Sequence, residues 1–130
     1  MYVPPGYGIV SPYLFVDDAV SYVAFLTTAF GAEEKDRTLR GDGRIANSQL
    51  SFSGTMIMLS EASPDYPASR AAHYLYVADA DASMARAVAA GATEILAVAD
   101  MPYEDRQGGV RDPAGNIWWI SQRLVPGAYR

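Results

Sequence analysis

Three residue types that often carry catalytic or metal chemistry, histidine, lysine and cysteine, are scarce or absent in this 130-residue chain. It has one histidine, His73, one lysine, Lys35, and no cysteine. A single imidazole cannot make a histidine-rich metal site, and a single lysine excludes Schiff-base chemistry spread over several lysines. Without cysteine there is neither thiolate chemistry nor a disulfide. A serine–histidine dyad would need His73, and nothing in the sequence places a serine beside it.

Two amides, Asn47 and Gln49, are two positions apart in an expected strand and therefore share one of its faces. If that face borders a cleft, they could orient a small ligand by hydrogen bonds. The alternative is that both face solvent on a half-exposed sheet. Arg106 also has two interpretations: it binds an anionic group of a ligand, or it pairs with Glu104 or Asp105 at the surface, which is the more common outcome.

The elements that would position these residues begin, in the first half of the chain, with a strand and a helix. The strand covers 9–16, with Pro12 at an edge or a non-paired position because proline lacks an N–H. Asp17 or Asp18 caps the helix, which ends at Gly31. Three strand-like runs follow at 33–40, 44–53 and 55–60, with Gly41-Asp42-Gly43 as a hairpin turn.

The second half repeats this order. Tyr74-Leu75-Tyr76-Val77 echoes Tyr13-Leu14-Phe15-Val16, and a helix capped by Asp79 or Asp81 follows and ends at Gly91. Three more strand-like runs cover 94–98, 107–111 and 116–122. We therefore expect an α+β fold of paired βαβββ modules that form curved sheets around a cleft. The expected modules cover about residues 8–62 and 71–124 of a single domain, 1–130, with a linker at about 63–70.

Composition and charge narrow the possible partners. The net charge of −5 and the lack of a Lys/Arg cluster argue against nucleic acid. The apolar runs are far shorter than a membrane span and the first residues do not form a signal peptide, so we expect a cytoplasmic protein with no membrane partner.

The first helix has an apolar surface wider than one stripe, because it also carries Val20, Tyr22 and Phe25. Either this helix lies deep in the domain or a second subunit covers it, and we expect a homodimer.

A strand–turn–strand segment late in the chain carries the most distinctive motif. It reads Asp105-Arg106-Gln107-Gly108-Gly109-Val110-Arg111-Asp112-Pro113-Ala114-Gly115-Asn116 and continues into Trp118-Trp119-Ile120. Together with Ser11-Pro12-Tyr13-Leu14-Phe15-Val16-Asp17-Asp18-Ala19 and Phe30-Gly31-Ala32-Glu33, it resembles the vicinal oxygen chelate superfamily and, within it, the PhnB-like subgroup. That superfamily includes glyoxalase I, extradiol dioxygenases, fosfomycin-resistance enzymes and bleomycin-resistance proteins. The resemblance implies the fold, whereas one fold hosts many chemistries and pure binders.

The resemblance also implies four positions at which enzymes of the superfamily hold a divalent metal with histidine, glutamine or glutamate. In this chain the four positions are Ser11, Met58, Ala72 and Trp119. These side chains cannot form a hard-cation site, which needs carboxylate oxygens or imidazole nitrogens. Some PhnB-like chains have His-Ala-Glu on the third strand, where this chain has Asn47-Ser48-Gln49. We therefore expect neither a metal nor another cofactor.

Residues at even spacing from these four positions lie on the same face of their strands, and many of them are aromatic, which predicts an aromatic lining of the cleft. If that side of each strand faces the cleft, so do Tyr13, Phe15, Tyr74, Tyr76 and Trp119. The alternative is an overfilled core without a cavity. His73 lies beside one of the positions and should turn to the opposite face. Tyr66 and Tyr103, in loops, could close over the cleft.

We predict that the protein binds a small aromatic or planar ligand without a metal, by sequestration as in bleomycin-resistance proteins. The predicted ligand-binding residues are Tyr13, Phe15, Asn47, Gln49, Met58, Tyr74, Tyr76, Arg106 and Trp119, with no catalytic residue. One alternative is a glyoxalase-like lyase or isomerase, or a dioxygenase-related enzyme. It would use an unconventionally held metal or acid–base groups such as Glu61, Asp105 or a tyrosine. Another is a structural or regulatory protein without a ligand.

Overall fold

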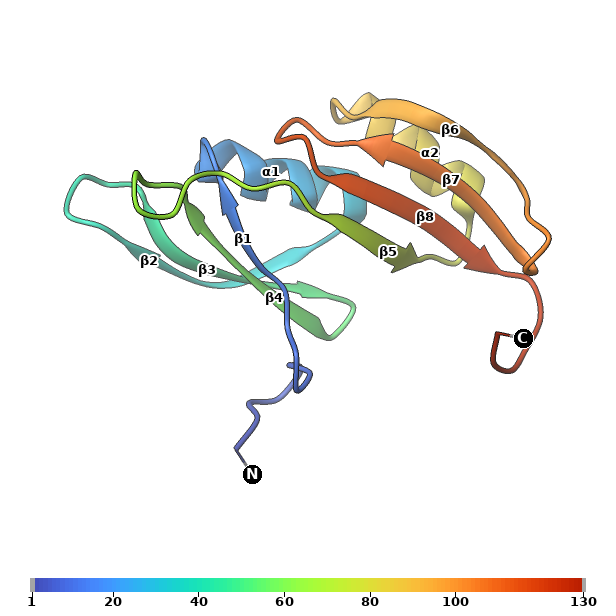
Figure 1. Ribbon diagram of the computed structural model, residues 1–130, viewed down its shortest axis with the longest axis horizontal. Helices are drawn as coiled ribbons and strands as arrows, with labels where there is room; N and C mark the ends of the chain where they lie inside the picture. The colour runs from blue at the N-terminus through green and yellow to red at the C-terminus, as the bar shows by residue number, and fades with distance from the viewer. Residues whose placement is uncertain (1, 130) are drawn as a thin grey trace. The chain divides into compact units, whose positions relative to one another are not determined.

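The computed structural model describes residues 2–129, which form a βαβββ series twice (Figure 1). The first series comprises β1 (Tyr13–Val16), α1 (Ala19–Phe30), β2 (Glu33–Leu39), β3 (Ile45–Phe52) and β4 (Thr55–Glu61). The second comprises β5 (Ala72–Tyr76), α2 (Ala80–Ala89), β6 (Thr93–Asp100), β7 (Asp105–Arg111) and β8 (Ile117–Arg123). The chain divides between Ser69 and Arg70 into two compact units, which we call unit one and unit two. The predicted α+β class and the paired βαβββ modules are confirmed.

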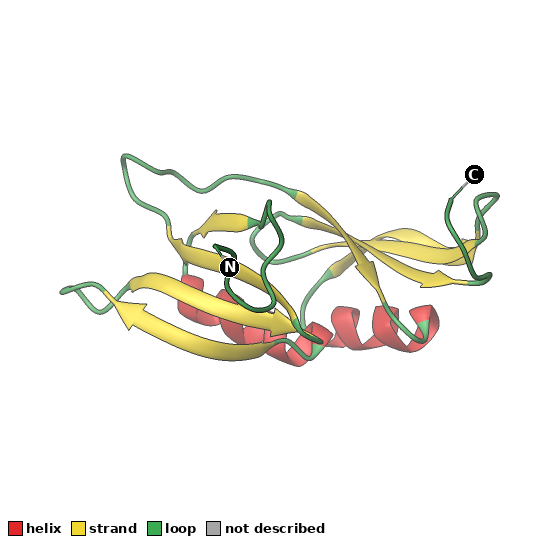
Figure 2. Ribbon diagram, turned by 90° about the horizontal axis from the view of Figure 1, so that it is seen from below, coloured by secondary structure: helices red, strands yellow, loops and turns green. Residues whose placement is uncertain are grey.

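Each unit contains a four-stranded sheet with the same strand order, β1-β4-β3-β2 in unit one and β5-β8-β7-β6 in unit two. The first and fourth strands of each unit pair in parallel, and the other neighbours pair antiparallel. The registers correspond, because Tyr13 lies opposite Met58 as Tyr74 lies opposite Trp119. Each helix lies against one face of its own sheet (Figure 2). We call the other face of each sheet its open face.

The helix-covered faces form the cores of the two units. In unit one, strand alternation turns Leu14, Leu50 and Leu59 towards Leu26 of α1, and all four are almost fully buried. Burial of one such leucine stabilises the fold by roughly 2 kcal/mol. The corresponding buried residues of unit two are Met84, Val110, Trp118 and Ile120. The apolar residues of alternate strand positions therefore decide which face each sheet buries.

The two helices begin at residues that can cap them. Asp18 is the N-cap of α1 and accepts a hydrogen bond from the N–H of Ser21 at 3.5 Å, and Asp79 has this role in α2. Gly31 ends α1 with φ at 69°, a left-handed conformation that glycine adopts without strain. In the part of the chain that the structure describes, no helix has the length and apolar character needed to cross a membrane.

β1 and β7 begin two or more residues away from their predicted starts, whereas β3, β6 and β8 differ by one residue. β1 begins at Tyr13 and not at residue 9, because Pro12 has no N–H to donate and the Ser11 hydroxyl bonds to the backbone of Gly8 at 3.1 Å in a local turn. β7 begins at Asp105 and not at Gln107, because Arg106 still pairs with Asp100 of β6 and Asp105 pairs with Arg123 of β8.

The turn between β7 and β8 is built from buried polar groups. Its Gly115 has φ at 89°, and one carboxylate oxygen of Asp112 accepts hydrogen bonds from the N–H groups of Ala114 and Asn116, both at 2.9 Å. The other oxygen accepts the indole N–H of Trp118 at 2.8 Å. The side-chain oxygen of Asn116 accepts the N–H of Ala71, at the entry to β5, at 2.8 Å. This motif therefore holds the fold together and contributes no reactive group.

Candidate ligand-binding site

Five predicted ligand-binding residues gather on the open face of unit one. Met58 of β4 pairs with Tyr13 of β1 on one side and with Gln49 of β3 on the other. The Asn47 amide nitrogen lies 3.6 Å from the Met58 sulfur. The ring of Phe15 extends the group, with its centroid 5.2 Å from that of Tyr13. Strand register alone thus brings side chains as far apart in the sequence as Tyr13 and Met58 into one patch.

A cavity of about 340 Å³ opens beside this patch. Tyr13, Phe15, Tyr66 and Arg40 contribute to its lining. The rings of Phe15 and Tyr66 stack with centroids 5.5 Å apart and planes inclined by 13°. Arg40 donates a hydrogen bond to the backbone carbonyl of Glu61, also in the lining. The volume lies in the range of ligand pockets, and stacked rings beside a guanidinium suit a planar molecule.

A β-bulge in β3 shapes this cavity. Thr38 pairs with Asn47, but the next residue, Leu39, pairs with Ile45, so Ala46 is an extra residue in β3. The extra residue shifts the alternation of side chains, and Ile45 is fully buried whereas Ala46 lines the cavity. No glycine marks the bulge, so the sequence did not predict it.

The two predicted amides lie outside the lining of this cavity and bond within the protein. The Tyr7 hydroxyl donates to Oε1 of Gln49 at 2.7 Å, and burial raises the pKa of Tyr7. The segment that carries Tyr7 is held along β4, because the Gly6 carbonyl accepts the N–H of Met56 at 2.9 Å. Tyr7 was not predicted, since an irregular segment rich in proline and glycine has no periodicity to interpret.

On the open face of unit two lie three predicted residues, Tyr74, Tyr76 and Trp119. The two tyrosines are about half exposed, at 47% and 55%, and their ring centroids are 5.6 Å apart. Trp119 lies over Gly109, where an added Cβ would come within 2.5 Å of the indole Cζ3. On the helix-covered face, a Cβ on Gly108 would come equally close to the Met84 methyl group of α2. The glycine pair therefore lets an indole and a helix approach β7 from opposite sides.

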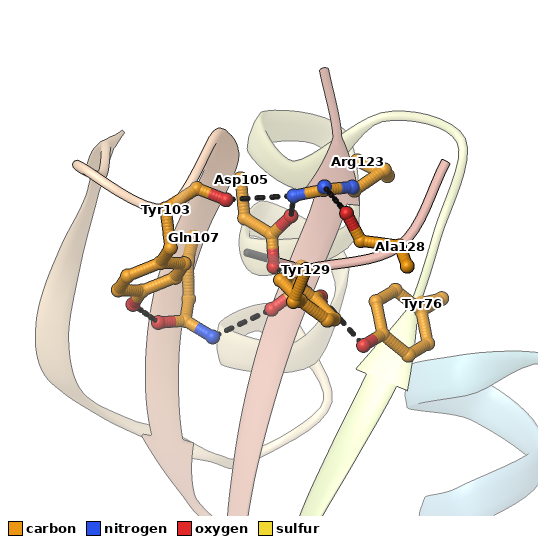
Figure 3. Close-up of polar contacts among 8 residues, drawn as sticks. Tyr76, Tyr103, Asp105, Gln107, Arg123, Ala128 and Tyr129 are labelled. Carbon is orange, nitrogen blue, oxygen red and sulfur yellow. Dashed lines mark hydrogen bonds and ion pairs between the residues drawn. The ribbon is translucent and has the colours of Figure 1, made fainter. Parts of the chain in front are cut away.

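A hydrogen-bonded network surrounds Asp105 at the end of this face (Figure 3). Asp105 is fully buried; Oδ1 accepts from Arg123 at 3.0 Å and Oδ2 accepts from the Tyr129 hydroxyl at 2.6 Å. The Tyr129 hydroxyl also lies 2.6 Å from that of Tyr76. Hydrogen bonds to Asp105 and then to Tyr76 raise the pKa of Tyr129 far above its usual value. A buried carboxylate thus stands directly behind the exposed tyrosines.

Two further residues extend this network. Gln107 donates to the Ser121 hydroxyl at 2.6 Å and accepts a hydrogen bond from the hydroxyl of Tyr103. Burial, followed by a hydrogen bond with Tyr74, raises the pKa of Tyr103. Tyr103 therefore links the turn before β7 to the aromatic side chains of the open face.

Arg106 lies apart from these aromatic residues, on the helix-covered side of β7. It forms ion pairs with Asp81 of α2 at 2.8 Å and with Asp100 of β6 at 2.9 Å, and both raise its pKa. The predicted pairing with Glu104 or Asp105 is wrong, because alternation along β7 turns Arg106 to the face opposite Asp105. The helix phase that brings Asp81 there is not visible from neighbouring residues in the sequence.

His73 also lies away from the open face, packed against Trp118 with ring centroids 4.5 Å apart and ring planes inclined by 35°. Its buried Nε2 atom has no hydrogen-bond partner within residues 2–129. Burial lowers the pKa of His73, and the negative charge of Asp112 opposes that shift only in part. The imidazole therefore acts as a packed neutral ring.

The four positions that correspond to metal ligands do not provide a fitting donor set. The Ser11 hydroxyl bonds to Gly8, the Met58 sulfur accepts from Asn47, and Ala72 and Trp119 offer no oxygen or imidazole nitrogen. Within the described residues, no three histidine, cysteine, aspartate or glutamate side chains cluster as a metal site would require. We therefore derive no chemical step through a metal.

The carboxylates considered for acid–base chemistry also have bonding roles. Glu61 accepts hydrogen bonds from the N–H groups of Asp18 and Ala19, both at 2.9 Å, and so caps α1 from outside the helix. Asp105 is paired with Arg123. Arg40, Arg123 and Tyr129 belong to the two sites without having been predicted from sequence. Long-range hydrogen bonds place them, and no local motif marks them.

Comparison with known proteins agrees with this architecture. A family model, the Glyoxalase/Bleomycin resistance protein/Dioxygenase superfamily, matches residues 8–120. The chain belongs to this superfamily. The resemblance inferred from the sequence is thereby confirmed at the level of the superfamily, as is the fold type.

Individual relatives of this superfamily member span most of its length. Protein Mb0911c of Mycobacterium bovis is 35% identical over 123 residues, covering 86% of this chain and 81% of its own. The structure of a gene product from Arabidopsis thaliana has a TM-score of 0.73 at 27% identity, over 88% of this chain and 98% of that one. TnmS3, an antibiotic binding protein from Streptomyces sp. CB03234, has a TM-score of 0.71 at 22% identity, with 95% and 98% covered. At that identity the likeness to TnmS3 concerns the fold.

Proposed function

We propose that this protein binds a small planar or aromatic molecule on its open faces, without a metal, and sequesters it. The observation that carries the proposal is the cavity of about 340 Å³ in unit one, where Phe15 and Tyr66 stack beside Tyr13 and Arg40. Burial of a planar ligand against such rings supplies affinity without an acid or a base. The antibiotic-binding role of TnmS3 on the same fold supports this kind of function.

The proposed ligand contacts are the aromatic and thioether side chains of the open faces. They are Tyr13, Phe15, Met58, Tyr74, Tyr76 and Trp119. Asn47 and Gln49 would join them only by exchanging their present partners, Met58 and Tyr7. Arg106, which faces α2 and is already paired twice, is the weakest of the predicted contacts.

We also propose that residues 1–130 act as one domain, with modules at about 8–62 and 71–124, in a cytoplasmic homodimer of the PhnB-like subgroup. The apolar width of α1 supports a partner subunit, since Val20 is 48% exposed although Tyr22 and Phe25 are buried. Sedimentation equilibrium measures the subunit number directly, and a monomer at all concentrations would contradict the dimer.

Thermal unfolding with planar compounds tests the binding function. Anthraquinone-2-sulfonate and 9-aminoacridine, in buffer with EDTA, should raise the melting temperature, because a ligand at 100 times its Kd adds about 2.7 kcal/mol to the free energy of unfolding. Phe15→Leu and Trp119→Leu should reduce the shift, whereas Tyr2→Leu, at a residue that is 87% exposed, should not.

Two results would overturn the proposal. If no planar compound stabilises the protein, the binding function fails. If the purified protein retains one Zn²⁺, Ni²⁺ or Fe²⁺ ion per chain, the metal-free part fails.

A further inference from the structure

The segment that follows β8, residues 124–129, forms a hook beyond the end of that strand (Figure 1) and brings Tyr129 beside Asp105 and Tyr76 (Figure 3). It is anchored at its start, where the N–H of Leu124 donates to the Glu104 carbonyl at 2.9 Å. It then turns through Gly127, with φ at 91°, and brings Tyr129 to the network around Asp105. The side chains between these points are exposed. The segment is therefore held mainly at its two ends.

The seat of Tyr129 has three parts with distinct chemistry. The Tyr129 hydroxyl donates a hydrogen bond to Oδ2 of Asp105, with 2.6 Å between the oxygens. The Tyr76 hydroxyl oxygen lies 2.6 Å from that of Tyr129, and Cζ of Arg123 lies 4.3 Å from the centroid of the Tyr129 ring. Asp105 and Tyr76 can therefore hydrogen-bond to a hydroxyl group, and the Arg123 guanidinium favours the face of an aromatic ring. Yet the Tyr129 side chain remains 48% exposed, so the seat covers only part of it.

Asp105 needs a donor at this place whether or not Tyr129 is there. Its side chain is fully buried, and Oδ1 is satisfied by Arg123 at 3.0 Å. If Tyr129 left, Oδ2 would lose this donor and would bond to water or to another O–H group. A second molecule with an O–H group at the same position would restore the bond.

Charge narrows what that molecule is. A carboxylate or phosphate would be repelled by Asp105, whose counter-ion Arg123 is already engaged. A cationic group would face the Arg123 guanidinium at close range. A neutral hydroxyl on an aromatic ring meets neither objection, and Tyr129 itself belongs to this chemical class.

A cavity of about 620 Å³ adjoins the seat and gives such a molecule room. One wall is the turn before β7, with Pro102, Tyr103 and Glu104; the other is the folded segment, with Val125, Pro126 and Ala128. Arg123 lines it as well, so the cavity and the seat of Tyr129 share one residue. The volume suits a molecule of several rings.

We infer that the seat of Tyr129 is a binding site for a hydroxyarene, a neutral planar aromatic whose hydroxyl donates to Asp105, and that Tyr129 is its tethered competitor. The inference rests on the proposed aromatic binding function and specifies one subsite of it. The ligand enters when the Tyr129 side chain leaves its seat while residues 124–128 remain as the wall of the cavity, and the tether keeps Tyr129 at a high local concentration. A segment that is seated nine-tenths of the time lowers the apparent affinity about tenfold.

A pair of probes tests the hydroxyl and the competitor separately. Equilibrium dialysis at neutral pH measures the Kd of 2-naphthol and of 2-methoxynaphthalene, which lacks the donor. Tyr129→Ala should tighten 2-naphthol binding about tenfold because the competitor is gone, and in this variant 2-naphthol should bind more tightly than 2-methoxynaphthalene. Tyr129→Phe keeps the ring and loses the hydroxyl, so its gain should be intermediate. Tyr2→Ala, at an exposed tyrosine of unit one, should change neither Kd.

A second variant tests whether Asp105 is the acceptor of the ligand hydroxyl. Asp105→Asn in the Tyr129→Ala background, with circular dichroism to confirm the fold, should abolish the preference for 2-naphthol over its methyl ether. No gain for 2-naphthol in Tyr129→Ala, or no preference for 2-naphthol over its methyl ether in that variant, overturns the inference. Wild-type stabilisation by anthraquinone-2-sulfonate or 9-aminoacridine would still stand in that case, so the two proposals fail independently.

Discussion

Unit one and unit two share their connectivity and the way they cap their helices, yet their open faces differ. At the end of the fourth strand, Glu61 accepts the N–H groups that begin α1, and Gln122 accepts the N–H of Ala80 that begins α2. On the open faces, Gln49 and Met58 of unit one correspond by register to Gly109 and Trp119 of unit two. A few positions on the helix-covered side thus maintain the fold, and the opposite side is free to change.

The hairpins that precede the last strands of the two units differ most in their polar contacts. Asp112 accepts three hydrogen bonds in unit two, whereas in unit one the Ser51 hydroxyl accepts one, from the N–H of Gly54 at 2.9 Å. Asp112→Ala should lower the free energy of unfolding by about 4 kcal/mol, because buried donors lose their acceptor. Ser51→Ala should lower it by about 1 kcal/mol. Urea unfolding measures both, and equal losses would refute the distinction.

Gly109 and Gln49 occupy corresponding positions in the two sheets. The Trp119 indole leaves no room for a side chain at position 109, whereas Gln49 has a long side chain that bonds to Tyr7. Gly109→Ala should displace the Trp119 indole, because the new Cβ would lie 2.5 Å from Cζ3, and it should cost about 2 kcal/mol of stability. The emission of tryptophan should change with it. Gln49→Ala removes only the bond to Tyr7 and should cost about 1 kcal/mol without a change in emission. An unchanged spectrum for Gly109→Ala would show that the indole does not depend on this glycine.

The side chains that cap the two helices from the fourth strands differ in charge: Glu61 is a charged acceptor for α1, and Gln122 is a neutral acceptor for α2. Glu61→Ala should lower stability by about 2 kcal/mol, since two N–H groups lose a carboxylate near the positive end of the α1 dipole. Gln122→Ala removes one neutral acceptor and should cost about 1 kcal/mol. Thermal unfolding gives both values. Glu61→Gln should fall between wild type and Glu61→Ala; a loss as large as that of Glu61→Ala would mean that charge alone matters.

His73 gives unit two a titrating group where unit one has Pro12, each directly before the first aromatic residue of its strand. Burial lowers the pKa of His73 in the fold, so below its ordinary value of 6.5 the unfolded chain binds the proton first. Stability should therefore fall as pH decreases below about 6.5, because proton uptake then favours the unfolded chain. His73→Phe should flatten that part of the stability–pH curve, and an unaltered curve would exclude His73 as its source.

The sequence predicted the features that depend on neighbouring residues. The order of strands and helices, the caps at Asp18 and Gly31 and the turn at Asp112 all follow from local propensity and spacing. Strand parity was also sufficient to group Tyr74 and Trp119 on one face.

The remaining features depend on contacts between distant segments. The bond from Tyr129 to Asp105 and the pairing of Arg106 with Asp81 join residues about 25 positions apart. Such contacts are fixed by sheet register and helix phase, which no short motif encodes. The bulge at Ala46 was missed for a related reason, since alternation in β3 looks regular until the partner strand is known.

The parallel pairing of first and fourth strands has a consequence for the growing polypeptide. The N–H of Ala71, at the entry to β5, finds its acceptor on Asn116, which is made 45 residues later. During synthesis β5 must therefore remain unpaired until the residues of β8 have also left the ribosome. Such distant closures slow folding, so we expect the nascent unit to depend on its locally stabilised helix and antiparallel strands until β8 arrives.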